Sequence, residues 1–439
     1  MKENKVLSLI IKMSIPPALS MIIQSLYNLI DSMYITSYDP KAMEAISIVY
    51  PIQNLILALS VGVGVGMNAC IAMKLGQKKH KEAENAATLG MILSFFHYII
   101  VLGLGLGLSK IFIESFTNEA LVIDYGTTYI HMIIIFSFTT IFQIAMEKIL
   151  QADGKMLLPM FSLLTGVIIN IVLDPILIFN CNMGVFGAAL ATVIAQVLAT
   201  MVMLYFILSK RNRVRLQIRG FYFDKSNLIS IYRIGIPSFF MNAIPSFMVT
   251  IMNYILITIN EMAITTFGIY YKLQYFVYMG VSGVAQGTMP LMSYSFGARD
   301  EKRLQVLLKD SILLSLGIGA IATLIFMGIP NLLMMMFYED QQLIAQTNTF
   351  LRLASIGFCF GCINYIMASY FQSIQRGITS LFLSLLRQLF LLLPLAYLLS
   401  MLLDENGVYL SIALSEITTT LLVFSSIFIK KRIRNKHDK

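Results

Sequence analysis

The chain has 439 residues, of which 57% are hydrophobic and only 13% are charged, and its formal net charge is +9. A water-soluble protein of this length needs far more polar surface to cover its core, so these proportions exclude a soluble globular protein. Apolar runs of about twenty residues, each long enough to cross a bilayer, recur along the whole chain. The sequence therefore predicts an all-α polytopic membrane protein, and the alternating pattern typical of outer-membrane strands is absent.

Taken in chain order, the apolar runs predict about twelve membrane-spanning helices, six in each half of the chain. The first six lie near residues 12–37, 44–74, 86–112, 124–151, 155–179 and 186–209. The second six lie near residues 228–259, 262–296, 304–330, 344–374, 377–400 and 406–430. We expect an N-terminal lobe over 1–215 and a C-terminal lobe over 216–439, joined by a basic cytoplasmic loop near 210–227.

Lysine and arginine residues predict the orientation of these helices. They cluster in the N-terminus, in GQKKHK (76–81), in KRNRVRLQIRG (210–220), in GARDEKR (297–303) and in KKRIRNK (430–436). These segments fall on one side of the membrane if the helices alternate, so the positive-inside rule places both termini in the cytoplasm. Because the basic residues sit in short loops beside the membrane, they predict topology and not nucleic-acid binding.

The chain contains an internal repeat with an offset of about 221 residues. The aligned pairs are Ile15-Pro16 with Ile236-Pro237, Gln53 with Gln274, Gly62 with Gly283, Gly66 with Gly287, Gly76 with Gly297 and Gln151 with Gln372. Six helices per copy is an even number, so both copies enter the membrane with the same orientation. We therefore expect two lobes related by a pseudo-two-fold axis along the membrane normal, which work by alternating access.

Two aspartates interrupt the apolar runs of the first half. Asp31 lies in SLYNLIDSMYI (25–35), and Asp174 lies in TGVIINIVLDPILIF (165–179). A charged carboxylate at the middle of a helix costs roughly 2.5–3.5 kcal/mol on insertion, and such groups usually face a bundle interior or a wet cavity. In the repeat these acids align with apolar residues of the second half. This asymmetry indicates a site that is built into the N-terminal lobe alone.

Further polar groups accompany Asp174. Asn170 lies four residues earlier, on the same face of a helix, and Thr192 of the next predicted helix adds a hydroxyl. With Asp31, this set can hold a proton, because two carboxylates in low dielectric resist ionising together, or it can bind Na⁺, which prefers oxygen ligands. The alternative is that each aspartate only caps or bonds a neighbouring helix. The residues alone do not decide between H⁺ and Na⁺.

Other polar residues at membrane depth are candidates for the substrate-binding cleft. Lys272 has no obvious partner; it could line the cleft or approach the neighbouring tyrosine rings. Arg387 and Glu416 are expected to pair across adjacent helices, the usual way to bury charge. Glu147 lies beside Lys148, one turn from the cytoplasmic end of the fourth predicted helix, and could simply snorkel. The candidates for the cleft are Tyr27, Asn28, Tyr271, Lys272, Gln274 and Tyr275.

The sequence resembles the multidrug and toxic compound extrusion (MATE) family over nearly its whole length, and within it the bacterial MepA-like and DinF-like type. The resemblance rests on the doubled six-helix plan, on IPPALSMIIQSLYNLIDSMYI (15–35), on the glycine-rich second helix ending LGQKK and on LQADGK (150–155). It implies a cation-coupled antiporter that exports amphipathic organic compounds as H⁺ or Na⁺ enters. It also implies a cation site at Asp31, Asn170, Asp174 and Thr192, and a bend in the first helix at Pro16.

The resemblance has two departures. The predicted tenth helix lacks the acid that some relatives carry, and LQADGK has Gln151 where many relatives have arginine. We expect a monomer without a cofactor in the bacterial inner membrane, acting on small amphipathic molecules in contact with lipid. The alternative function is a lipid-linked precursor flippase with the same two-lobed plan. A membrane-embedded enzyme is disfavoured because the sequence has no HExxH or GxSxG motif.

Overall fold

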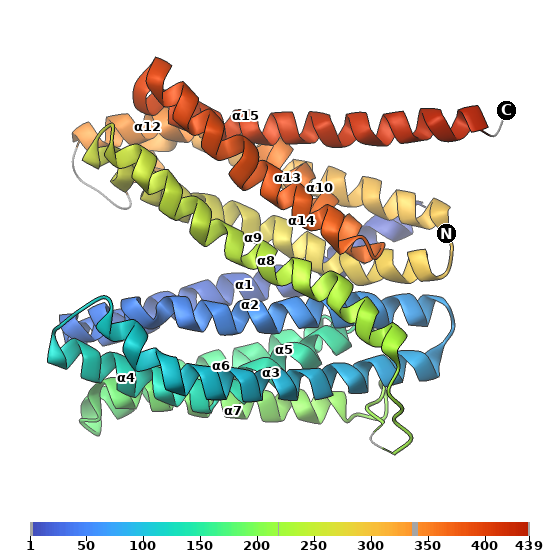
Figure 1. The fold of residues 1–439 in the computed structure, drawn as a ribbon, viewed down its shortest axis with the longest axis horizontal. Coiled ribbons are helices and arrows are strands. Elements are labelled where there is room, and N and C mark those ends of the chain that lie inside the picture. The colour runs from blue at the N-terminus through green and yellow to red at the C-terminus, as the bar shows by residue number, and fades with distance from the viewer. Residues whose placement is uncertain (1–2, 218, 336–340, 438–439) are drawn as a thin grey trace.

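The computed structural model describes residues 3–217, 219–335 and 341–437 of the chain. These residues form a bundle of long helices and contain no strand in the described ranges. Figure 1 shows two groups of helices that approach each other at one end, near both termini, and diverge at the other. The predicted all-α fold with two lobes is confirmed.

The first group contains the helices of the N-terminal half. They are α1 (Glu3–Tyr38), α2 (Pro40–Gly76), α3 (His80–Glu114), α4 (Ala120–Ile135), α5 (Ser137–Ala152), α6 (Leu157–Pro175), η1 (Ile176–Asn180) and α7 (Gly184–Ile207). The element η1 is a π-helical turn that continues α6 after Pro175, which lacks an amide hydrogen. The segment between α7 and α8 connects the two groups (Figure 1).

The second group contains the helices of the C-terminal half. They are α8 (Lys225–Ile257), α9 (Glu261–Gly297), α10 (Glu301–Gly328), α11 (Pro330–Met335), α12 (Gln341–Ser355), α13 (Phe358–Ser373), α14 (Gly377–Leu385), the π-helical η2 (Leu386–Leu391) and α15 (Leu392–His437). Within α15 the backbone leaves the helical region at Asp404 (φ 51°), so this element contains two helical segments.

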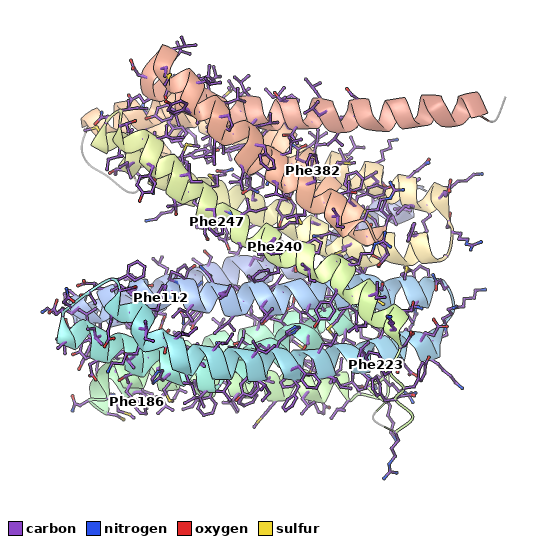
Figure 2. All side chains as sticks on the ribbon, viewed as in Figure 1. Phe112, Phe186, Phe223, Phe240, Phe247 and Phe382 are labelled. Atoms are coloured by element: carbon purple, nitrogen blue, oxygen red, sulfur yellow. The ribbon has the colours of Figure 1, made fainter. Side chains whose placement is uncertain are left out.

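These helices account for twelve membrane spans. Among the described residues, eight helices are long and apolar enough to cross a membrane, and two bent pairs pass the same test when each pair is taken as one span. The segment Gly377–Ser425, one of the eight, supplies two spans because it breaks at Asp404. The 37-residue helix α9 completes the set. Phenylalanines stand out on the outer surface, as expected for helices that face lipid; those labelled in Figure 2 are Phe112, Phe186, Phe223, Phe240, Phe247 and Phe382.

Two predicted helices are bent in the structure. The helix expected over 124–151 bends by 45° at Phe136, and the helix expected over 344–374 bends by 52° after Ser355. Near the first bend, the hydroxyl groups of Ser137 and Thr139 donate to the carbonyl oxygens of Ile134 and Phe136. Such side-chain bonds compete with the helical amide ladder, which favours a bend without proline. The helix predicted to begin near 12 begins instead at Glu3.

The helix ends follow capping rules. Asp39 accepts a hydrogen bond from the Lys41 amide at 2.9 Å at the start of α2, and Asp224 accepts from the Ser226 amide at 2.8 Å at the start of α8. Asn260 does the same for α9. Each side chain satisfies an amide that a helix start leaves free. The turns between spans are therefore set by local sequence.

The two halves meet at helix faces lined by glycine, and the glycine contacts of one half are repeated at the equivalent positions of the other half. A side chain at Gly62 of α2 would lie 2.8 Å from the Gly235 oxygen of α8, and one at Gly283 of α9 would lie 2.8 Å from the Ala18 Cα of α1. Gly62 and Gly283 are partners in the sequence repeat. The absence of a side chain lets the helix backbones approach closely, as is typical of packing in membranes.

Candidate cation site in the N-terminal half

Helices α1, α6 and α7 bring the four predicted cation-site residues together. Asn170 and Asp174 occupy one face of α6, and the Asn170 Nδ2 atom lies 3.3 Å from Asp174 Oδ1. The same Nδ2 atom lies 3.4 Å from the Thr192 hydroxyl of α7. Asp174 is fully buried, and Asn170 and Thr192 are 1% and 6% exposed. The polar groups therefore face the interior of the N-terminal half and not lipid.

The Asn170 amide can be turned so that its nitrogen and oxygen exchange places. In that orientation the nitrogen donates to Asp174 Oδ2 at 2.7 Å, and the oxygen accepts from the Thr192 backbone amide at 3.3 Å. In this orientation each contact joins a donor to an acceptor. Asn170 thus links α6 to α7 and holds one carboxylate of the site.

Asp31 of α1 completes the group. Its carboxyl group lies beside that of Asp174. The Asp31 Oδ1 atom is buried and accepts no hydrogen bond from any donor in the described part of the chain. Two carboxylates in contact inside a protein repel each other strongly unless a proton or a cation lies between them. The pair can therefore share a proton or ligate a hard cation through oxygen.

Tyrosine and glutamine side chains surround the acids. Tyr27, a predicted cleft residue, lies one helical turn before Asp31 on α1, near Thr192 and both acids. Tyr129 of α4 is 4% exposed, lies near both acids and pairs with Gln53 of α2, whose Nε2 atom is 3.4 Å from the phenol oxygen. Sequence reasoning missed Tyr129, which has no feature that separates it from other tyrosines. Gln53 had a signal, its alignment with Gln274 in the repeat.

The other cleft candidates do not join the acid group. Tyr271, Lys272, Gln274 and Tyr275 lie on α9 of the C-terminal half; Lys272 and Tyr275 are exposed, and the other two are half-buried. Asn28 of α1 is also exposed. The predicted residues thus form two separate sets, one inside the N-terminal half and one on α9.

Pro16 lies buried within α1, which continues as one helix from Glu3 to Tyr38. The contacts of α1 with the two glycines of α9 flank this proline. A side chain at Gly287 would lie 2.6 Å from the Met13 oxygen, and the Gly283 contact is at Ala18. Pro16 therefore stands where the two halves meet. Its effect on bending stays a prediction.

Arg387 and Glu416 form the predicted ion pair of the C-terminal half. Arg387 Nη1 lies 3.3 Å from Glu416 Oε1. Glu416 Oε2 also accepts a hydrogen bond from Asn364 Nδ2 at 2.8 Å. Both charges are thus compensated between helices, and the predicted pairing is confirmed.

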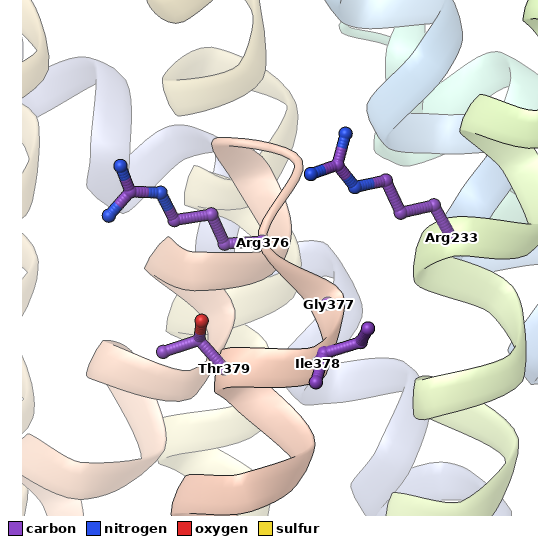
Figure 3. Close-up of a pocket in the computed structure, with 5 residues that line it drawn as sticks. All are labelled: Arg233, Arg376, Gly377, Ile378 and Thr379. Atoms are coloured by element: carbon purple, nitrogen blue, oxygen red, sulfur yellow. The ribbon is translucent and has the colours of Figure 1, made fainter.

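A surface pocket lies elsewhere, between α8 and the start of α14. It has a volume of about 350 Å³ and is lined by Arg233, Arg376, Gly377, Ile378 and Thr379 (Figure 3). It shares no residue with the acid group.

Comparisons with known proteins agree with this architecture. The model of the MatE family matches residues 16–176 and 237–398, one match in each half of the chain. The chain is 23% identical to the multidrug export protein MepA of Staphylococcus haemolyticus over 436 residues, which covers 99% of this chain and 95% of that protein. It is 22% identical to MepA of a bovine strain of Staphylococcus aureus over 430 residues, covering 98% and 95%.

Solved structures share the fold. A MATE-family multidrug resistance transporter in an outward-facing conformation superposes with a TM-score of 0.91 at 24% identity, covering 100% of this chain and 99% of the other. A MOP-superfamily transporter from Pyrococcus furiosus gives a TM-score of 0.90 at 24% identity, covering 99% and 98%. The family match in both halves and the shared fold lead to one conclusion: the chain belongs to the MATE family of membrane transporters.

Proposed function

We propose that this protein is a cation-coupled antiporter that exports amphipathic organic compounds. The observation that carries the proposal is the contact between the carboxyl groups of Asp31 and Asp174, with one buried oxygen of Asp31 free of any described donor. Such a pair is costly inside a membrane protein unless it holds an ion, and groups of this kind mark ion pathways. The staphylococcal relatives are multidrug export proteins, which supports export over the flippase alternative.

The coupling follows from the position of the site. Asp31 belongs to α1, which packs against α9 of the other half, whereas Asn170 and Asp174 belong to α6. Binding of H⁺ or Na⁺ removes the repulsion between the two acids and stabilises α1 against α6. Release of the ion weakens this contact. A ligand shifts a conformational equilibrium by its difference in affinity for the two states, and a site between two elements supplies such a difference.

The same proposal covers the cellular setting. The basic turns support a bacterial inner-membrane location with both termini in the cytoplasm, because arginine and lysine stay on the cytoplasmic side. A monomer suffices, since one chain contributes both lobes and the whole acid group. The division at residues 215 and 216 falls in the segment between α7 and α8 and is proposed as the lobe boundary.

Transport assays in proteoliposomes test the proposal. We expect Asp31→Asn and Asp174→Asn each to reduce efflux driven by an imposed H⁺ or Na⁺ gradient by at least about tenfold, a usual size of coupling between two sites. Separate gradients of H⁺ and Na⁺ identify the ion. Asp124→Asn is the matched control, because Asp124 is exposed on α4 outside the acid group. Unchanged gradient-driven efflux in both site variants would disprove the assignment.

A further inference from the structure

Lys272 of α9 lies on the face that turns toward the N-terminal half. The glycines Gly283 and Gly287 of α9 contact α1 at Ala18 and Met13. Lys272 is eleven residues before Gly283, which is close to three helical turns, so both residues share one face of α9. The two helices run antiparallel, because Gly283 of α9 contacts Ala18 of α1 whereas the later residue Gly287 contacts the earlier residue Met13.

This register sets the level of Lys272 in the membrane. Both helices have the same rise per residue, and they run in opposite directions. A step of eleven residues back along α9, from Gly283 to Lys272, therefore matches a step of about eleven residues forward along α1 from Ala18. This step leads to the turn of α1 that contains Asn28, which is exposed. Lys272 and Asn28 therefore lie at about the same level of the two antiparallel helices, and both are exposed.

A second observation shows that this face looks across the lobes. Tyr275, one turn from Lys272 on α9, lies near Tyr50 of α2 in the N-terminal half. Their exposed fractions are 53% and 55%, so both rings are largely uncovered. An exposed ammonium group, an exposed amide and two exposed tyrosine rings thus lie on helices α9, α1 and α2.

The ammonium group of Lys272 has no protein partner. Within the described ranges it forms no ion pair or hydrogen bond, although it is on a membrane-spanning helix. The acids at comparable depth are engaged elsewhere: Asp31 with Asp174, and Glu416 with Arg387. An unpaired cation at membrane depth is costly unless it faces a wet cavity, and such residues mark substrate or ion paths.

We propose that Lys272 binds the anionic group of the transported compound, so that the substrates of this protein include amphipathic aromatic anions. This inference deepens the export function proposed above and rests on it. The ammonium pairs with a carboxylate or sulfonate, and the aromatic body of the compound lies between Tyr50 and Tyr275. An organic cation at the same position meets like charge from Lys272. Lys272 is therefore the residue that sets the charge preference.

Binding to the purified full-length protein in detergent tests this preference without any gradient. The probes are naphthalene-2-sulfonate and the matched cation in which the sulfonate is replaced by trimethylammonium, both followed by equilibrium dialysis. We expect the wild type to bind the anion more tightly, and Lys272→Gln to weaken anion binding by about tenfold, the usual loss for one hydrogen bond to a charged group. Lys272→Arg should keep the preference, and Lys272→Glu should reverse it.

Lys309→Gln is the control, because Lys309 is an exposed lysine on α10 of the same half. The proposal is overturned if the wild type prefers the cation, if Lys272→Glu leaves the preference unchanged, or if neither probe binds. Because no ion gradient is imposed, failure of cation coupling would leave this result intact. The two proposals are thus tested separately.

Discussion

The polar residues of the C-terminal half show how single side chains are compensated in this membrane protein. Glu416 is 8% exposed, and its two carboxylate oxygens contact Arg387 and Asn364. The ion pair between Lys110 and Glu114 is different: the atoms are 3.8 Å apart and the side chains are 62% and 48% exposed. Burial determines the cost of removing one partner, because a buried charge without its counterion keeps the full desolvation penalty.

We therefore expect Glu416→Gln to destabilise the protein by about 3–5 kcal/mol, because it leaves Arg387 buried without a counter-charge. The double variant Arg387→Leu/Glu416→Leu should recover most of this loss. Glu114→Gln should cost no more than about 1 kcal/mol, the usual range for an exposed pair. Unfolding of each variant in the same detergent measures the differences. If the single variant is as stable as the wild type, the buried pair has no structural role.

Among the elements, α2 is set apart by its glycines. Its residues Gly62 and Gly66 contact α8 of the other half, and Gly64 contacts the Lys148 side chain of α5. Gly103 and Gly107 of α3 have open space where a side chain would be. The glycine runs of α2 and α3 look alike in sequence, SVGVGVG and LGLGLG. The contacts in the structure are needed to tell which glycines pack against another helix and which tolerate a side chain.

This difference predicts opposite outcomes for the same substitution. Gly66→Ala places a methyl group against the backbone of Ile231, which cannot move without shifting α8, so we expect a loss of about 1–3 kcal/mol. Gly107→Ala meets no atom and should be neutral or stabilising by up to about 1 kcal/mol, since alanine favours the helix. The apparent melting temperatures of the two variants report the effect. Equal shifts for both would contradict close packing of α2 on α8.

At the scale of the whole molecule, the repeat predicted from sequence recurs in the backbone. Six of the eight residues with left-handed φ in the described ranges form three pairs about 221 residues apart, as the repeat expects. They are Lys78 (62°) with Arg299 (57°), Gly154 (84°) with Gln375 (63°) and Asn182 (52°) with Asp404 (51°). Composition, helix number and the two-lobed plan were therefore predictable, because hydrophobic runs and turn positions are local properties of the chain.

Contacts between distant segments could not be predicted in the same way. The cation-site residues on α6 share a helical face, which spacing predicts, but Tyr129 reaches them only through the packing of α4. Glu147, expected to snorkel, is instead joined with Lys148 in a network. Lys148 is 7% exposed, and its ammonium contacts Glu147 at 2.9 Å and Gln151 at 3.1 Å. This network gives Gln151 a structural role.

The same ammonium joins the two halves. Lys148 Nζ of α5 lies 3.0 Å from Gln286 Oε1 of α9. Nearby, Gly76 of α2 packs against Tyr294 and Ala298. In the antiport mechanism proposed above, this end, at which Gly76 lies, opens, so the Lys148–Gln286 bond breaks in each cycle.

Gln286→Leu removes the bond but leaves Lys148 paired with Glu147 and Gln151, so the fold should persist. A hydrogen bond to a charged group contributes about 1.5–3 kcal/mol, so we expect its loss to raise the population open at this end by roughly tenfold or more. Spin labels at Gln77→Cys and Ala298→Cys, in a background without the four native cysteines, report the distance across this end. Gln286→Glu is the matched variant: it replaces the bond with an ion pair to Lys148 and should shorten and narrow the distance distribution. If both variants give the wild-type distribution, the Lys148–Gln286 bond does not hold this end closed.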